Sequence, residues 1–412
     1  MTRDLTYEDT GAAITIEAND VSIDFNSHRL LLTDGAATGV LAVGVRNLEL
    51  LNGTIELLDG VEPTVLTSTA IALTTVVKVH IDNILTRNTY RGININSPSP
   101  APSSEGILIE NSVHKDHEYV ASNPLLRASV AVRILDSINV ILRNNSVSAT
   151  PREIDPTISP AATGYLFVRT EGIIIENVNL TGLDISIALS TTHNVVMDKV
   201  TVESSPLSQF NFIQIVSSIN TIIRNSSFTS TGVLVFDGIL LASGSNFLLE
   251  NVVIKANTVG TVDFPVTAAI HVGGAGLFTD VKIVDTIVSG QNVNAIVINE
   301  ASNVTLDNVV VSGALENNIR LITAQQVTIK NSDVQSGTVN GILIEATSSC
   351  NTVQTSNIRD NGLGLAIAVG SINNVIRDNN FYCNVTNVSD LNLLPTNTYV
   401  HNIPVSINNT NF

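Results

Sequence analysis

Side chains that could do chemistry gather in one part of the chain, between residues 87 and 184. Residues 87 to 169 are about one fifth of the sequence, yet they hold eight of its 20 lysines and arginines, with histidines and carboxylates among them. Such groups on neighbouring loops can bind an acidic glycan and supply an acid and a base for its cleavage. In that hypothesis the candidate acids and bases are His117, Glu118, Glu153 and Asp155, and the candidate binding residues are Arg87, Arg91, Lys115, Arg152 and Tyr119.

Two histidines of this region, His114 and His117, have the spacing His-x-x-His beside acidic residues. Such a pair can bind a divalent metal, but zinc signatures carry further ligands at fixed spacing. We therefore predict no metal site, and these two histidines are the candidates if one exists. The alternative interpretation of the whole region is a set of solvated loops with local ion pairs.

A repeat in the sequence predicts the scaffold that holds these loops. The pattern apolar-x-Asn-x-x-apolar recurs every 22 to 33 residues. We call the residue at its Asn position the anchor. The residue two places before the anchor is apolar in all 13 copies. The 46 asparagines of the chain include nine of the anchors. The anchors are Asn52, Asn83, Asn111, Asn144, Asn177, Lys199, Asn225, Asn251, Asp280, Asn308, Asn331, Thr355 and Asp378.

The segments around the anchors alternate between apolar and polar residues, which is typical of strands. One repeat cannot bury its apolar face alone, so repeats stack into parallel sheets around a continuous core. The pattern predicts an all-β, single-domain solenoid of about 13–14 coils, with a lead-in or cap at 1–13, coils at 14–384 and a cap or arm at 385–412. Asn tolerates the left-handed backbone of a sharp turn, and stacked amides can hydrogen-bond between coils. A β-sandwich with Asn-rich turns is the alternative.

Several stretches resemble a known family. Gly172-Ile-Ile-Ile-Glu-Asn177-Val, Asn303-Val-Thr-Leu-Asp-Asn308-Val and Asn374-Val-Ile-Arg-Asp378-Asn-Asn look like the right-handed parallel β-helix repeats of pectin-lyase-like proteins. The resemblance covers roughly residues 12 to 385. It implies the fold but no single activity, because the family includes polysaccharide lyases, hydrolases and epimerases, phage and viral spikes, spore and surface proteins, and periplasmic repeat proteins linked to copper-enzyme maturation.

Composition excludes several classes of protein. The net charge of −17 argues against a nucleic-acid partner, which needs clustered cations. No apolar run approaches 18 residues, so no membrane insertion is predicted. No signal peptide is evident, and a location outside the cell or on a particle surface is favoured by the family resemblance. Cys350 and Cys383 could pair or remain as buried thiols.

The residue before each anchor is predicted to point outward, because its neighbours on both sides point inward. Its charge alternates, as in Glu110, Arg143 and Glu176, which relieves repulsion between stacked coils. We interpret this column as a solvated row of charges. The alternative is a groove of carboxylates and arginines that holds sugar or Ca²⁺, the one cofactor that the sequence leaves open.

Two functions remain open. The first is a non-catalytic, rigid β-helix that serves as a structural, surface or assembly protein of a virus particle, spore coat or cell envelope. Its partners would be further copies, with a trimer as one form, other structural subunits, or a polysaccharide bound without turnover. The second is a polysaccharide lyase or hydrolase that acts on an acidic glycan through the loops of residues 87–184. The sequence lacks Trp and the local Asp, His and Arg motifs of polygalacturonase-like hydrolases, which favours the first.

Overall fold

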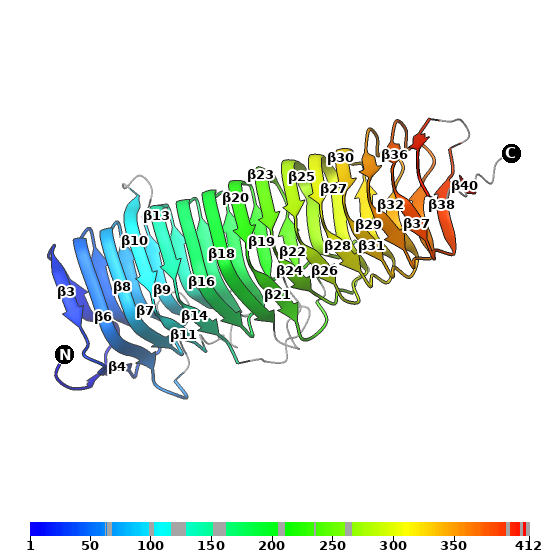
Figure 1. Ribbon diagram of the computed structural model, residues 1–412. Helices are drawn as coiled ribbons and strands as arrows, with labels where there is room; N and C mark the ends of the chain where they lie inside the picture. The colour runs from blue at the N-terminus through cyan, green and yellow to red at the C-terminus, as the bar shows by residue number, and fades with distance from the viewer. Residues whose placement is uncertain are drawn as a thin grey trace. The chain divides into compact units, whose positions relative to one another are not determined.

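The computed structural model describes residues 1–61, 63, 68–98, 103–116, 129–150, 162–204, 211–234, 236–259, 266–392, 396–403 and 407–408. Contacts between Cα atoms divide the chain into two compact units, Met1–Ser208 and Gln209–Phe412, and each is described by itself. Both units consist of short strands that pair in parallel with the strand one coil away (Figure 1). The solenoid of parallel sheets predicted from the repeat is confirmed, and so is the right-handed parallel β-helix that the family resemblance implies.

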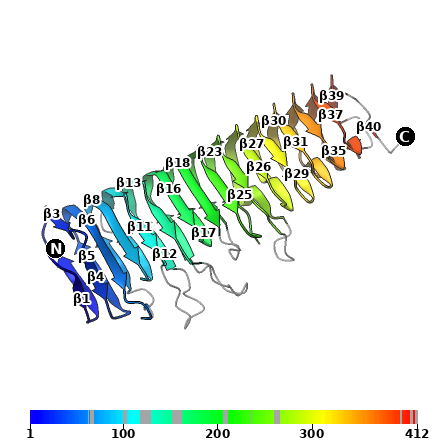
Figure 2. The same ribbon diagram turned by 60° about the horizontal axis from the view of Figure 1, so that its bottom comes forward.

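Three sheets, here called the first, second and third faces, enclose the core of the N-terminal unit (Figures 1 and 2). The first face contains β2 (Gly11–Ile16), β5 (Ala37–Val43), β7 (Thr69–Thr74), β9 (Arg91–Asn96), β12 (Ser129–Leu135), β15 (Ala162–Val168) and β17 (Ile185–Ser190). The second contains β3 (Val21–Asp24), β10 (Ser104–Glu110), β13 (Ser137–Arg143) and the first halves of β6 (Arg46–Leu57), β8 (Val77–Arg87), β16 (Glu171–Thr181) and β18 (His193–Ser204). The third contains β1 (Leu5–Tyr7), β4 (Arg29–Leu32), β11 (Val113–Lys115), β14 (Ser146–Ser148) and the second halves of those four long strands.

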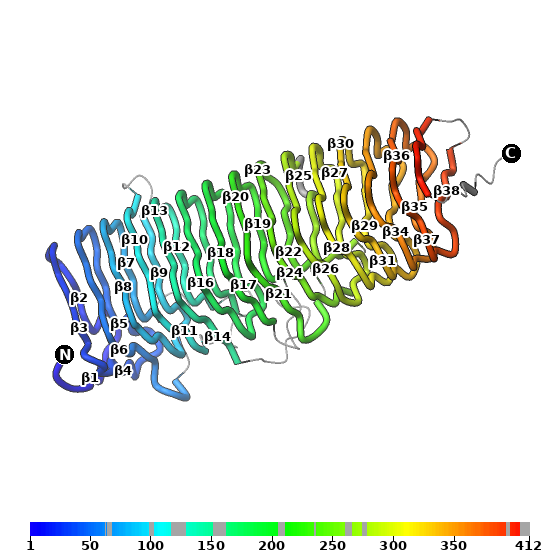
Figure 3. The backbone as a smooth tube through the Cα atoms, in the orientation of Figure 1, coloured from blue at the N-terminus to red at the C-terminus, as the bar shows by residue number. Residues whose placement is uncertain are grey.

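The C-terminal unit repeats this arrangement (Figure 3). Its first face contains β19 (Ile213–Val216), β22 (Ile239–Leu241), the starts of β25 (Ala268–Val284) and β27 (Asn294–Asp307), β29 (Asn317–Ile322), β32 (Asn340–Ile344), β35 (Leu363–Ile367), β38 (Thr386–Asp390) and β40 (Ile407–Asn408). Its second contains β20 (Ser218–Arg224), β23 (Gly244–Glu250), the ends of β25 and β27, β30 (Gln325–Lys330), β33 (Thr352–Gln354), β36 (Val375–Arg377) and β39 (Thr398–Val400). Its third contains β21 (Ser227–Ser230), β24 (Val253–Lys255), β26 (Ile287–Ser289), β28 (Val310–Ser312), β31 (Asp333–Gln335), β34 (Asn357–Arg359) and β37 (Asn380–Tyr382).

Inward side chains of successive coils stack in register. On the second face of the N-terminal unit, Ile81 pairs with Ile109, and Leu142 pairs with Ile175. All four side chains are fully buried. Burial of one such side chain contributes about 1.5–3 kcal/mol, so the apolar period of the sequence accounts for the stacking of the coils.

All 13 predicted anchors have left-handed backbone, with φ between 49° and 59°. In the N-terminal unit the Asn144 amide donates to Asn111 Oδ1 at 3.1 Å, and the Asn177 amide donates to Asn144 Oδ1 at 2.8 Å. All of them except Asp280 therefore turn the chain from the second face to the third, and Asn111, Asn144 and Asn177 also join neighbouring coils through their side chains.

One anchor was assigned to the wrong residue. The motif fits both Asp280 and Asp285, because an apolar residue lies two places before and three places after each of them. In the structure the Asn308 amide donates to Asp285 Oδ1 at 2.6 Å, so Asp285 is the anchor of that coil. Asp280 belongs to a second left-handed turn, between the first and second faces, where it accepts a hydrogen bond from the Asn303 amide.

Replacement of Asn144 tests the role of the anchors. Alanine at this left-handed position is expected to lower the free energy of unfolding by about 2 kcal/mol, because a Cβ disfavours this backbone and the amide hydrogen bonds are lost. Asn144→Gly loses the same hydrogen bonds but keeps the backbone, and should cost about 1 kcal/mol or less. Urea denaturation measures both values. Equal losses in the two variants would show that backbone conformation is not what selects Asn here.

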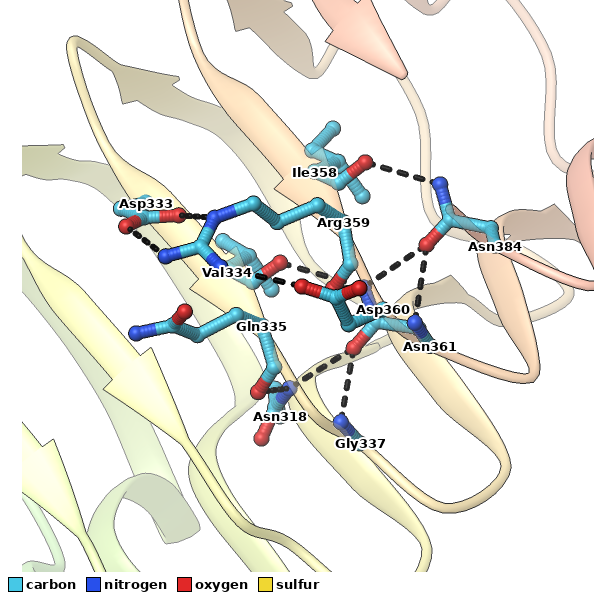
Figure 4. Close-up of polar contacts among 10 residues, drawn as sticks. All are labelled: Asn318, Asp333, Val334, Gln335, Gly337, Ile358, Arg359, Asp360, Asn361 and Asn384. Carbon is cyan, nitrogen blue, oxygen red and sulfur yellow. Dashed lines mark hydrogen bonds and ion pairs between the residues drawn. The ribbon is translucent and has the colours of Figure 1, made fainter. Parts of the chain in front are cut away.

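Buried amides occupy a turn of the C-terminal unit as well (Figure 4). Asn361 is 2% exposed. Its Oδ1 accepts hydrogen bonds from the Gly337 backbone N–H at 2.8 Å and from the Asn318 amide at 3.1 Å. Its own amide donates to the carbonyl oxygens of Val334 and Arg359, at 3.1 and 2.8 Å. Asn361 thus satisfies buried backbone groups of its own coil and of the preceding one.

Strand pairing continues beyond both limits predicted for the coils. Leu5 pairs with Leu30 before residue 14, and Val375 pairs with Thr398 after residue 384. These end strands are short and rich in polar residues, so the apolar period does not reveal them. Their role as caps stays a prediction. Among the described residues no helix is long and apolar enough to span a membrane.

Neither interpretation of the two cysteines is correct. Cys350 and Cys383 are both unpaired and both exposed. Each has left-handed backbone, with φ of 59° and 55°, and therefore lies at a turn rather than in an inward strand position.

A carboxylate near the C-terminus gives the fold a pH dependence. Asp390 is 6% exposed. Burial raises the pKa of its carboxyl group, but hydrogen bonds from Asn397, Asn392 and Tyr399 outweigh burial, and the net pKa is below the usual value. A lowered pKa in the folded state contributes stability above the unfolded pKa of about 3.9, and this contribution is lost as the pH falls through and below that value.

We therefore expect residues 386–403 to exchange their amide hydrogens faster at pH 3 than at pH 6, after correction for the intrinsic rates. Asp390→Ala should exchange faster than the wild type at pH 6, and the difference between the two proteins should narrow as the pH falls to 3. Hydrogen exchange followed by mass spectrometry measures this. A gap between the two proteins that stays constant across this pH range would contradict the assignment to Asp390.

Candidate functional site

The second face of the N-terminal unit carries a column of charged side chains that point outward. Asp82 pairs in register with Glu110, Glu110 with Arg143, and Arg143 with Glu176. The residue before each of them, such as Ile81 before Asp82, is buried in the core, so alternation along the strand directs these charged side chains to the outside. The predicted charge column is therefore one continuous row on this face.

Arg143 separates the carboxylates of Glu110 and Glu176 in this row, whereas Asp82 and Glu110 are direct neighbours. Arg143 Nε lies 3.2 Å from Glu176 Oε2, and its Nη1 lies 3.9 Å from Glu110 Oε2. Exposed pairs of this kind each contribute about 0–1 kcal/mol. Their main effect is to remove the repulsion that stacked carboxylates would otherwise have.

A histidine joins the row at its N-terminal end. His80 Nε2 lies 2.9 Å from Glu110 Oε1, and Asp82 Oδ1 accepts a hydrogen bond from the Asn111 amide at 2.8 Å. One potential ligand atom each from His80, Asp82 and Glu110 lies within 4.8 Å of the other two. His80 also lines an open recess of about 420 Å³, together with Asp20, Asn47, Glu49 and Lys78. His80 is not among the residues predicted from the sequence, although the pattern His80-x-Asp82 at outward positions points to it.

The structure separates three of the predicted binding residues. Arg87 and Lys115 pair in register on the third face, where Arg87 Nη2 lies 3.7 Å from Asp59 Oδ1. Arg91 lies on the first face, beyond a turn, with its guanidinium 5.4 Å from the centre of the Tyr90 ring. The predicted cluster of these three cations is thus spread over two faces.

Arg91 has another arginine nearby. Arg133 lies one coil further along the first face, and its Nη1 donates to Asn94 Oδ1 at 3.0 Å. Burial lowers the pKa of both guanidinium groups, and the positive charge of Arg91 lowers that of Arg133 further. Two half-buried cations with like charge would bind an anion favourably.

The remaining predicted residues His117, Glu118, Tyr119, Arg152, Glu153 and Asp155 lie outside the described residues. His114 is fully buried, and its Nδ1 lies 2.8 Å from Thr86 Oγ1. It occupies the inward position of its strand, in register with Val147. His114 is therefore a core residue rather than a loop residue.

The C-terminal unit contains one pair that the sequence did not reveal. His271 Nδ1 lies 3.1 Å from Asp237 Oδ2, and each side chain is 12% exposed. Asp237 Oδ1 also accepts a hydrogen bond from the Ala268 backbone N–H at 2.7 Å. Asp237 thus fixes the start of β25 and orients the imidazole ring. No spacing rule could have found this pair, because its members are 34 residues apart on different coils.

The comparisons with known proteins concern the fold and identify no residue of the candidate site. A model of the family described as periplasmic copper-binding protein (NosD) matches residues 265–411. No curated protein sequence matches the chain.

Solved structures similar to the chain include a mannuronan C-5 epimerase A-module of Azotobacter vinelandii, with 12% identity over 93% of this chain and 87% of that one, and a TM-score of 0.43. The Dettilon tailspike protein has 13% identity over 86% of this chain and 62% of that one, with a TM-score of 0.46. The surface adhesin PfbA of Streptococcus pneumoniae has 12% identity over 82% of this chain and 86% of that one, with a TM-score of 0.40.

Proposed function

We propose that this chain is a non-catalytic β-helix that serves as a structural, surface or assembly element and presents an outward face to a partner. The observation that carries the proposal is the pairing of outward charges between coils. Arg143 lies between Glu110 and Glu176 in the N-terminal unit. In the C-terminal unit Lys330 Nζ lies 3.0 Å from Asp307, and Arg359 Nη2 lies 2.9 Å from Asp333. These groups stabilise the stack of coils. A catalytic acid or base instead needs surroundings that shift its pKa to suit proton transfer.

An apolar strip beside the charged row suits a partner. Leu108, Ile141, Ile174 and Val196 pair in register on the outward side of the second face. Ile174 is 40% exposed. An apolar strip flanked by charges is typical of surfaces that bind another protein or the apolar face of a sugar. We propose that the partner is a further copy of this chain or another structural subunit.

Two measurements test this proposal together. The purified chain would be incubated with acidic and neutral polysaccharides, with and without Ca²⁺, while new reducing ends and unsaturated products are followed. Its mass in solution would be measured by light scattering, with Ile174→Asp as a variant of the strip. We expect no products, and an oligomer that Ile174→Asp weakens. Turnover of any polysaccharide would overturn the non-catalytic role. A mass equal to that of one chain at all concentrations would exclude a further copy of this chain as the partner.

The cations of the first face support a second candidate, the binding or cleavage of an acidic glycan. Arg91 and Arg133 are half-buried on adjacent coils, and the positive charge of Arg91 acts on Arg133. A carboxylate sugar would relieve this repulsion and form bidentate hydrogen bonds with a guanidinium group. Binding of polygalacturonate or alginate, measured by calorimetry, should weaken in Arg133→Gln and stay unchanged in Arg377→Gln, an exposed arginine of the C-terminal unit. Equal binding by the two variants would exclude the first-face site.

A further inference from the structure

The outward corner of the second face formed by His80, Asp82 and Glu110 has the donors of a metal site. His80 and Asp82 lie two residues apart on β8, so both side chains leave the same side of the sheet. Glu110 lies on the next coil, directly opposite Asp82 in the parallel register. The fold thus brings one imidazole and two carboxylates together from two adjacent strands.

The distances fit a small divalent ion. The three donor atoms lie within 4.8 Å of one another. Zinc binds imidazole nitrogen and carboxylate oxygen at about 2.0–2.2 Å, which places tetrahedral ligands about 3.3 Å apart. His80 Nε2 and Glu110 Oε1 are 2.9 Å apart, so a small rotation of either side chain would admit an ion between them.

Neighbouring groups hold the two carboxylates in place. The Asn111 amide binds Asp82 Oδ1, which leaves Oδ2 available for an ion. Arg143 lies beside Glu110 Oε2, while Oε1 faces His80. Outer hydrogen bonds and ion pairs of this kind orient metal ligands in known sites. Val79 and Ile81 are buried on either side of His80 and fix its strand.

The recess beside His80 would leave the ion accessible. It is open to solvent and is lined by His80, Glu49 and Lys78. Glu49 pairs in register with His80 from the preceding coil. With three protein ligands, a tetrahedral ion would keep a fourth position for water or a ligand, as in zinc sites with an open position.

We propose that His80, Asp82 and Glu110 form a binding site for a divalent transition-metal ion of the zinc type. One nitrogen and two oxygen donors favour such an ion over Ca²⁺ and Mg²⁺, which take oxygen ligands. The site lies outside residues 265–411, the range of the family match. It shares Glu110 with the charge pairs of the proposed structural role, but it does not require that role.

Titration of the metal-free chain with ZnCl₂, followed by calorimetry and by competition with a chromophoric chelator, tests the proposal. We expect one ion per chain with a dissociation constant of micromolar or below. His80→Gln should weaken binding at least tenfold, and Asp82→Asn and Glu110→Gln should act in the same direction. A hundredfold excess of Ca²⁺ should not displace the ion.

The chain offers a matched control on the same face. His193 and Glu171 are an exposed outward histidine and acid that pair in register on β18 and β16. His193→Gln and Glu171→Gln should bind zinc as the wild type does, and so should His117→Gln. Unfolding by urea verifies that each variant is folded. Absence of saturable zinc binding, unchanged affinity in His80→Gln, or loss of binding in His117→Gln alone would each overturn the proposal.

Discussion

Asn361→Leu is expected to lower the free energy of unfolding by about 3–4 kcal/mol. Leucine has a similar volume but cannot accept from the Gly337 N–H and the Asn318 amide, nor donate to the carbonyls of Val334 and Arg359. Each buried group left without a partner costs about 1–3 kcal/mol. The hydrogen bonds in Figure 4 show how many groups one amide serves.

Urea denaturation and hydrogen exchange at the Gly337 amide measure this effect. Exchange is the more direct of the two, because coils of a solenoid can open locally. Asn357→Leu is the matched control, since Asn357 is an exposed asparagine four residues earlier in the same coil. It should change stability by no more than about 0.5 kcal/mol. A Gly337 amide that stays equally protected in Asn361→Leu would contradict the role given to Asn361.

The sequence predicted the fold because inward residues obey a local rule. Ile109 and Ile175 each lie two places before an anchor, and both stack in the core. An apolar residue at a fixed offset from a turn needs no knowledge of other coils. The rule failed at Asp280 and Asp285, where two overlapping copies of the motif compete and only coil-to-coil hydrogen bonds decide between them.

Contacts between coils follow no such local rule. His80 and Glu110 are 30 residues apart, and the length of each coil varies with the loops inserted in it. Only the register of the parallel strands shows that they meet. The same reason hid the pair of Asp237 and His271. The cations of residues 87 to 115 are close in sequence, but they do not form one cluster. The turn before Arg91 places Arg91 on a different face from Arg87.

Ile175→Ala should destabilise the chain by about 3 kcal/mol, whereas Ile174→Ala should change its stability by no more than about 0.5 kcal/mol. The two residues are adjacent in β16, but their side chains leave opposite sides of the sheet. Ile175 is fully buried between Leu142 and Met197 of the neighbouring coils. Truncation there removes apolar burial and leaves a cavity that rigid neighbouring strands cannot close. Ile174 is 40% exposed and opens no cavity.

The comparison separates core packing from strand propensity, since both variants replace isoleucine by alanine in the same strand. Thermal and urea unfolding of the two proteins measure the difference. If the chain assembles through the strip that contains Ile174, Ile174→Ala should weaken the oligomer while leaving the unfolding midpoint of the dilute monomer unchanged. Equal destabilisation of both variants would mean that the side chains on both sides of β16 are buried. In that case the second face would be covered rather than open, and the outward surface proposed for the partner would not exist.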